Sequence, residues 1–412
     1  MSILPGQPGT GKDVVFDAVI SDLSAALGLT DGVLIVLGQT KPKPEWVFQR
    51  GARWRVIELK APSPLAAFGF VLWRLLTGKP ATLSQTLFLS PGVVRRINRI
   101  LSDAAVELTV FDTIRTFDEA IAPDRRRVVF LDDLFSERFA ERAGQPRLRG
   151  EKVLGRYADA ARFWSRLLSP AWAARTAMRV EARLCRLKER AVAKVASACV
   201  LLNENEQAEL ARRAGVSVHS YIPRLSAYAG GSASAGVDGK WLFVGALDYA
   251  PNAEAMIWFI DNVLPHYRRA GGLRPLRVIG RNCAPELASR LAVAGVEHVG
   301  FVEDLAKEYA GAAGVLIPIQ SGSGVKIKAL EAMSTGRWTV GTPRAYDGLG
   351  ALPPNALSAE EPAAFARAML DVETLDPAAE AETSSGWFEA RFGPERLDRL
   401  RTIVADDGQV GA

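Results

Sequence analysis

The chain has 412 residues, of which 48% are hydrophobic and 24% are charged. These proportions are ordinary for a globular protein, so they exclude disorder over most of the length, and the length predicts two domains. Three widely spaced cysteines and three histidines argue against a disulfide framework and a histidine-built metal site, and they favour a reducing compartment.

The net charge of +5 is unevenly distributed. Residues 1–239 carry 34 Lys and Arg against 24 Asp and Glu (+10), whereas residues 240–412 carry 17 against 22 (−5). This division indicates that the two halves of the chain bind different partners. No basic start or apolar run opens the chain, and its most apolar stretch, Leu65–Trp73, is too short to span a bilayer. We therefore expect a cytoplasmic protein, either soluble or peripheral at the membrane.

The stretch GQPGTGKD, Gly6–Asp13, matches the phosphate-binding pattern G-x-x-x-x-G-K-[ST] in every position except the last, where Ser or Thr is expected. Asp13 stands where a hydroxyl should hold Mg²⁺, and its carboxylate would repel phosphates at close range. Only Ser2–Leu4 are available for the strand that should precede such a loop. A P-loop ATPase is therefore an alternative and not the main hypothesis.

Apolar runs of strand and helix type alternate along the chain and are interrupted by a Gly/Ser/Ala-rich stretch at 227–240, which predicts a linker. Before the linker we predict strands at Gly32–Leu37, Trp54–Leu59, Leu108–Phe111, Val128–Leu131 and Ala198–Leu202, and helices at Asp13–Leu27, Pro91–Asp103 and Glu204–Ala214. After it we predict strands at Trp241–Val244, Leu276–Ile279, Val296–Val299, Gly314–Pro318 and Thr339–Gly341, and helices at Asn252–Tyr267, Ala284–Ala294, Glu303–Ala312, Val325–Ser334 and Pro362–Asp371.

Strand–helix alternation of this kind predicts the α/β class with parallel, doubly wound sheets. We expect two Rossmann-like domains, residues 1–226 and 241–383, facing each other across a cleft, with a C-terminal helix and tail at 384–412. Ligands of such sheets bind at the carboxyl ends of the strands, so the cleft is the expected site.

The stretch PIQSGSGVKIKALEAMSTG, Pro318–Gly336, carries the most chemistry. A buried strand runs into a small-residue loop and then into a helix, and the N-terminus of a helix favours phosphate. Lys326 is expected in the first turn, where a cation opposes the helix dipole unless it pairs with an anion. Lys328 and Glu331 are expected on one helix face, and a carboxylate there suits a ribose diol. The alternative is a packed turn with solvated lysines.

From Trp241 to Gly350 the chain resembles the C-terminal domain of GT-B glycosyltransferases of the retaining family 4 group, through FVGALDYAPNAEA, LRVIGRN, VGFVED and SGSGVKIKALEAMSTG in this order. The resemblance implies a nucleotide-sugar donor bound by this domain, with Glu331 on the ribose and Lys326 or Lys328 on the diphosphate. It also places Val302 beside the base, Gly280 and Arg281 along the cleft, and the loop residues Ser323, Gly324 and Val325 at the donor.

Two departures from the family pattern bear on catalysis. Ser323 stands where the family has a glutamate eight residues before Glu331, and an Arg/Lys pair is missing from ALDYAPNAEA. These departures keep open the alternative of a catalytically inactive GT-B-like scaffold or regulator of polysaccharide synthesis.

In the N-terminal half, the resemblance gives PGTGKD a different task. Gly9 and Gly11 would bring the backbone close to the donor, and Lys12 would offset its charge; the alternative is a purely structural turn. Asp132 and Asp133 end a predicted strand, where they could orient the acceptor hydroxyl or cap the next helix. Together with Lys328 they are our catalytic candidates. Retention with front-face attack requires no metal and no added cofactor.

The run Arg175–Lys194 places basic residues at three- to four-residue steps, which predicts a cationic stripe on one helix face. Its members proposed for an acceptor or a membrane are Arg175, Arg179, Arg183 and Arg190. Nearby Trp164 and Trp172 make an anionic membrane surface a candidate partner, with a solvated face as the alternative. Nucleic acid is disfavoured because no nucleic-acid module is recognisable. The resemblance to this family implies transfer of a sugar to a glycan or lipid-linked acceptor, in bacterial surface or exopolysaccharide assembly.

Overall fold

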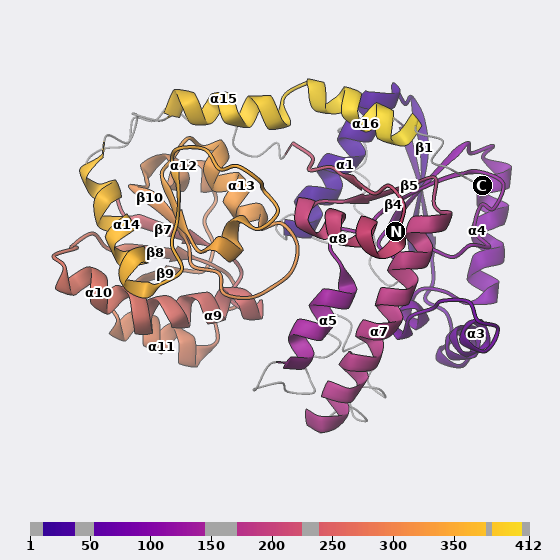
Figure 1. Cartoon of the computed structure of the whole chain (residues 1–412), viewed down its shortest axis with the longest axis horizontal. Coiled ribbons are helices and arrows are strands. Elements are labelled where there is room, and N and C mark those ends of the chain that lie inside the picture. The colour runs from indigo at the N-terminus through magenta and orange to yellow at the C-terminus, as the bar shows by residue number, and fades with distance from the viewer. Residues whose placement is uncertain (1–10, 38–52, 145–170, 225–238, 376–380, 406–412) are drawn as a thin grey trace. The chain divides into compact units, whose positions relative to one another are not determined.

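The computed structural model describes residues 11–37, 53–144, 171–224, 239–375 and 381–405 (Figure 1). These residues form two compact units. Unit 1 consists of residues 23–222 and 399–405, and unit 2 consists of residues 11–22 and 223–398. Every described strand pair in both units is parallel, which confirms the predicted α/β class. Most of the predicted linker, Gly9, Trp164 and the predicted strand Ser2–Leu4 lie outside the described residues.

Unit 1 contains two parallel sheets. The first pairs β1 (Asp31–Leu37) with β2 (Arg53–Leu59), and the second has the order β3 (Leu108–Asp112), β4 (Arg126–Phe130), β5 (Ala198–Leu201), β6 (His219–Ser220). The helices are α3 (Pro64–Leu76), α4 (Pro91–Asp103), α5 (Phe135–Gly144), α7 (Ala171–Val195) and α8 (Glu204–Ala214), with a 3-10 helix, η1, at Leu83–Leu87. Helices α1 (Gly11–Leu27) and α16 (Glu395–Ala405) contribute residues to both units.

The sequence marks the ends of two of these helices well enough to be predicted to the residue. The Ser90 hydroxyl accepts a hydrogen bond from the Val93 N–H at 3.4 Å, and Pro91 occupies the first position of α4. The Asn203 side chain accepts two backbone N–H groups at the start of α8, which ends at Gly215 with φ +69°.

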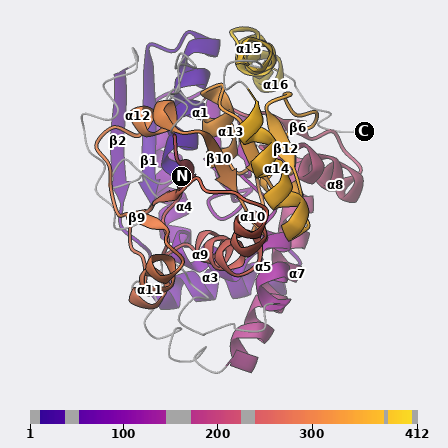
Figure 2. The same ribbon diagram turned by 90° about the vertical axis from the view of Figure 1, so that its left-hand side faces the viewer.

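Unit 2 is one six-stranded parallel sheet flanked by helices, and it faces the viewer in Figure 2. The strand order is β12 (Ala356–Ser358), β11 (Thr339–Gly341), β10 (Gly314–Ile317), β7 (Trp241–Val244), β8 (Leu276–Ile279), β9 (Glu297–Val299). The helices are α9 (Ala250–Trp258), α10 (Leu264–Arg269), α11 (Pro285–Val293), α12 (Leu305–Gly311), α13 (Ile327–Ser334), α14 (Pro362–Thr374) and α15 (Ala381–Phe392), with a 3-10 helix, η6, at Pro343–Tyr346.

Large apolar side chains from both the sheet and the helices fill the core of unit 2. Trp241, Phe243, Phe259 and Phe365 are fully buried, and Phe365 packs edge-on against Phe259 with ring centroids 6.3 Å apart. Burial of such aromatic side chains stabilises the fold by roughly 1.5–3 kcal/mol each. The sheet is thereby held as a firm base for the loops at its carboxyl edge.

Several predicted boundaries differ from the structure. The helix predicted over Asn252–Tyr267 contains a π-helical turn, η5 (Phe259–Val263), between α9 and α10. The predicted C-terminal helix is two helices, because Gly393 and Pro394 interrupt it and proline cannot continue a helix. Helices α3 and α5 and strands β6 and β12 were not predicted. Among the described helices none is long and apolar enough to cross a membrane.

Candidate functional site

The strand order of unit 2 locates the candidate site. The first strand of the unit, β7, lies between β8 and β10, so the chain leaves it in one direction and later returns on its other side. At such a switch point the loops after the two central strands diverge and open a crevice at the carboxyl edge of the sheet. The relevant loops are those that follow β7 and β10.

The loop after β10 is shaped by two glycines and one lysine. Gly322 and Gly324 have φ values of +102° and +73°, in the left-handed region that favours glycine. The Lys326 Nζ donates to the carbonyl oxygens of Gly322, Ser323 and Gly324 at 2.8, 3.1 and 2.6 Å. This ammonium therefore holds the curvature of the loop.

The start of α13 differs from the prediction. The helix begins at Ile327, and Lys326 is its N-cap with an extended backbone (φ −85°, ψ 97°), so its predicted place in the first turn is wrong. The glycine conformations and the lysine–carbonyl contacts hold the preceding residues outside the helix. Val325 is likewise in the loop and not in the helix.

Lys328 lies in the first turn of α13, and its Nζ reaches back toward the loop after β7. The Nζ contacts Asn252 Oδ1 and lies 4.7 Å from the centroid of the Phe243 ring. Burial lowers the pKa of Lys328 to about 7, and the Glu331 carboxylate opposes this shift. The site thus contains an ammonium that titrates near neutral pH.

Glu331 follows Lys328 by three residues and shares its helix face. Burial raises the pKa of Glu331 to about 7, and the positive charge of Lys328 opposes this shift. A cation suited to phosphate and a carboxylate suited to a diol therefore stand together at the start of one helix, as the sequence predicted.

Asn252 positions the ammonium and was not among the predicted residues. It is 5% exposed, and its Nδ2 donates to the Ala246 carbonyl oxygen at 2.8 Å, which turns Oδ1 toward Lys328. Glu254, also on α9, accepts a hydrogen bond from the Ser321 hydroxyl at 2.8 Å and so ties the β10 loop to this helix. The sequence signal was the polar pair in PNAE, at the start of the helix that follows β7.

Two glycines bring the backbones of neighbouring loops into contact. A Cβ at Gly280, after β8, would lie 2.2 Å from the Gly245 carbonyl oxygen. A Cβ at Gly245 would lie 2.8 Å from the Lys328 Nζ. Both positions therefore require glycine for the loops to approach and for Lys328 to reach Asn252.

The remaining unit 2 candidates lie around the same edge of the sheet. Arg281 follows β8, Val302 follows β9, and Ser323 is in the β10 loop; all three are half-buried. The donor-binding candidates between residues 280 and 331 thus lie in the loops after β8, β9 and β10 or in α13, the helix that follows the β10 loop.

In unit 1, the two aspartates after β4 differ in their surroundings. Asp133 is buried, and its Oδ2 accepts from Arg138 Nε at 2.7 Å and Nη2 at 2.5 Å. Its carboxylate is thus held in an ion pair with Arg138. Asp132 is half-buried and has φ +62°, a backbone conformation that is uncommon outside glycine.

The remaining candidates lie on α1, whose residues 11–22 belong to unit 2, and on α7 of unit 1. Gly11 begins α1 and Lys12 is in its first turn. On α7, Arg179, Arg183 and Arg190 are exposed, whereas Arg175 is half-buried. The predicted cationic face is therefore present on the surface of this unit.

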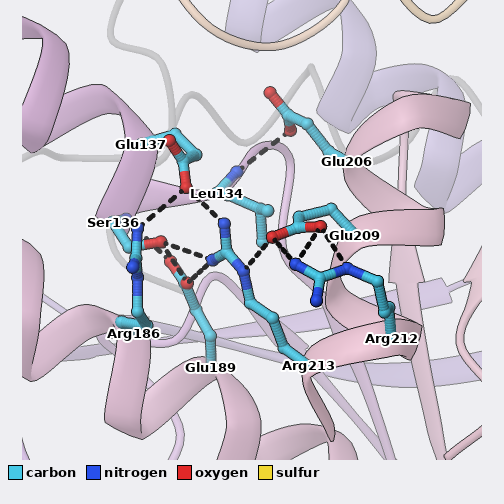
Figure 3. Close-up of polar contacts among 9 residues, drawn as sticks. All are labelled: Leu134, Ser136, Glu137, Arg186, Glu189, Glu206, Glu209, Arg212 and Arg213. Carbon is cyan, nitrogen blue, oxygen red and sulfur yellow. Dashed lines mark hydrogen bonds and ion pairs between the residues drawn. The ribbon is translucent and has the colours of Figure 1, made fainter. Parts of the chain in front are cut away.

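Another side of α7 contributes Arg186 and the buried Glu189 to a polar network (Figure 3). Glu189 is 1% exposed and accepts hydrogen bonds from the Ser136 N–H at 2.8 Å and the Ser136 hydroxyl at 2.5 Å. Arg213 of α8 pairs with Glu137 and with Glu209, the latter at 2.6 Å. This network links α5, α7 and α8 and fixes which side of α7 faces solvent.

The fold is shared with solved glycosyltransferase structures. A structure of HepE from Anabaena bound to UDP and glucose superposes with a TM-score of 0.58 at 13% identity, covering 97% of this chain and 96% of HepE. A UDP-forming α,α-trehalose-phosphate synthase from Burkholderia xenovorans bound to glucose-6-phosphate gives a TM-score of 0.56 at 11% identity, covering 98% of each chain. The chain thus has the GT-B fold.

The family comparison concerns unit 2. Residues 238–374 match the family model of glycosyl transferases group 1, which confirms the resemblance predicted for this region. The matched residues include the whole constellation of Asn252, Gly280, Lys328 and Glu331. No curated protein matches the chain by sequence.

Proposed function

We propose that the protein transfers a glycosyl group from a nucleotide diphosphate sugar to a glycan or lipid-linked acceptor, with UDP-sugars as the first donors to test. The observation that carries the proposal is the half-buried Lys328, held by Asn252 and sharing a face of α13 with Glu331, inside the region that matches the group 1 model. The UDP in the HepE structure supports the choice of base.

The proposed mechanism assigns each group of the site a task. Glu331 accepts hydrogen bonds from the two ribose hydroxyls, and Lys328, oriented by Asn252, contacts the diphosphate. As the glycosidic bond breaks, negative charge grows on the leaving diphosphate, and the ammonium stabilises it. Front-face attack with retention lets this diphosphate take the proton of the acceptor hydroxyl. Arg138 occupies the Asp133 carboxylate, which supports giving the proton to the leaving diphosphate and not to this aspartate.

We propose that the exposed arginines of α7 receive the acceptor or the membrane that carries it. Arg179, Arg183 and Arg190 are exposed, and Trp172 at the start of the helix is 73% exposed. Cations beside an exposed indole suit anionic phospholipids or a lipid diphosphate. This assignment supports a role at the inner face of a bacterial cell membrane, in polysaccharide assembly.

Donor binding is tested by thermal shift with UDP-, GDP- and dTDP-sugars, because a bound donor stabilises the folded state by mass action. One of these is expected to raise the melting temperature, and Glu331→Ala to abolish the shift. Glu303→Ala, at an exposed carboxylate of the same unit, is the matched control. An unchanged shift in Glu331→Ala would remove Glu331 from the site.

Turnover separates the alternatives. Acceptor-dependent release of nucleoside diphosphate supports the transferase; donor binding with no release for any glycan or lipid acceptor supports the inactive scaffold. Mg²⁺-dependent ATP hydrolysis that is lost in Lys12→Ala would support the ATPase.

For α7, the triple change Arg179→Glu, Arg183→Glu and Arg190→Glu is expected to release the protein from anionic vesicles. If the variant still sedimented with the vesicles as the wild type does, the arginines would form only a solvated face.

A further inference from the structure

Helix α3 exposes several large apolar residues to solvent, whereas its one charged residue is buried beside Ala67, Phe70 and Val71. Leu65, Leu72, Trp73 and Leu76 are 88, 44, 53 and 78% exposed. Arg74, in contrast, is 2% exposed. In a water-soluble unit the reverse arrangement would bury the leucines and hydrate the guanidinium.

The orientation is fixed by specific contacts. Arg74 Nε lies 3.5 Å from Asp118 Oδ2, and Arg74 Nη2 lies 3.7 Å from Glu119 Oε2. Ala67 and Val71 are buried on the same side of the helix. A rotation of α3 that buried its leucines would separate Arg74 from Asp118 and leave a buried charge without its partner, which would cost several kcal/mol of folding free energy. The apolar face is therefore held outward.

The surroundings of this face are cationic. Between Lys60 and Ser102 the chain has six basic residues and no acidic one. Lys60 and Lys79 flank α3 and are exposed, and the Lys79 Nζ lies 6.0 Å from the Trp73 ring centroid. On the neighbouring α4, Arg95, Arg96 and Arg99 are also exposed.

We propose that α3 is a membrane-insertion helix that lies in the interface of an anionic lipid bilayer. Leu65, Leu72 and Leu76 enter the acyl boundary, Trp73 lies at headgroup level, and the flanking lysines contact lipid phosphates. The charge pattern selects this partner, since an acid-free segment around an apolar face favours anionic lipid over a second, equally basic copy of the same surface. The inference is independent of glycosyl transfer and of the arginines of α7.

The test uses the full chain with vesicles of phosphatidylcholine alone and of phosphatidylcholine mixed with phosphatidylglycerol. Binding to the mixed vesicles is expected, and Leu65→Gln, Leu72→Gln and Leu76→Gln together should weaken it by about tenfold or more. The matched control is Leu273→Gln with Val293→Gln, two side chains of unit 2 that are 82 and 88% exposed. All of these side chains face solvent, so the variants should keep the wild-type melting temperature.

A second measurement locates the helix directly. An environment-sensitive fluorophore is attached to Leu76→Cys in a Cys283→Ser background, where the other two cysteines, Cys185 and Cys199, are buried and do not compete for the label. Its emission maximum should shift to the blue when the mixed vesicles are added. Equal binding of the triple variant and the wild type, or no spectral shift, would overturn the proposal. So would a wild-type dimer, seen by sedimentation, that the triple change dissociates, because a second copy would then cover α3.

Discussion

The titration of Lys328 and Glu331 makes the pH dependence of donor affinity a sensitive test of the site. The diphosphate requires the ammonium form of Lys328. Burial lowers the pKa of this lysine to about 7. The charged fraction falls from about three-quarters at pH 6.5 to about 3% at pH 8.5, so this group alone weakens binding about 25-fold over that range. UDP-glucose suits the test because both of its phosphates stay ionised there.

Glu331 acts in the opposite sense. Its carboxylate form binds the ribose, and burial raises its pKa to about 7, so its charged fraction rises about fourfold between pH 6.5 and 8.5. The wild type should therefore lose about sixfold in affinity over this range. Glu331→Gln should bind more weakly and lose at least 25-fold over this range, because removal of the carboxylate takes away the charge that opposes the lowering of the Lys328 pKa. Lys328→Met should reverse the slope, since only the carboxylate then titrates.

Isothermal titration calorimetry with UDP-glucose at several pH values measures these slopes. Lys307→Met, at an exposed lysine of the same unit, should keep the wild-type profile. A wild-type affinity that is flat with pH, or a Lys328→Met slope of unchanged sign, would refute the assignment of Lys328 to the diphosphate.

Two further predictions concern stability. Gly280→Ala places a Cβ 2.2 Å from the Gly245 carbonyl oxygen and should lower the free energy of unfolding, measured in urea, by about 1–3 kcal/mol. The control Gly300→Ala, whose Cβ meets no atom within 4 Å, should leave it unchanged. Equal effects of the two changes would show that the loops have room for a methyl group at position 280. Burial raises the pKa of Glu189 to about 7, so the native state binds more protons than the unfolded state between pH 4.5 and 7, and stability should fall as pH rises through this window. Glu189→Gln should flatten that fall, and an unchanged slope measured by chemical denaturation would assign it to other groups.

The sequence predicted the elements best where local signals mark both ends. Helix α8 has an asparagine before it and a glycine after it, and both its ends were predicted to the residue. Helix α3 was missed as an element, although its apolar run was noted, because its buried arginine and outward leucines contradict the pattern of a surface helix. Only tertiary contacts to Asp118 and Glu119 settle its orientation.

The same limit applies within the candidate site. Lys326 and Lys328 are two residues apart in one motif, and the sequence could assign either to a diphosphate. The structure separates them through contacts with residues that the motif does not contain: Lys326 donates to carbonyl oxygens of its own loop, whereas Lys328 reaches Asn252 of α9. That Glu331 shares a helix face with Lys328 was predicted from spacing alone, because helix periodicity fixes the relation between the two positions.

The basic residues of the two units differ in burial, and this difference suits them to different anions. Lys328 lies in the half of the chain that is net negative, and its burial makes its charge depend on pH and on the arrival of a counter-charge. A small anionic ligand can supply that counter-charge at short range, where screening by salt is weak. The arginines of α7 named above are, in contrast, cationic side chains of which three lie exposed at the surface. Exposed on the basic half, they produce a constant field that suits an extended anionic surface.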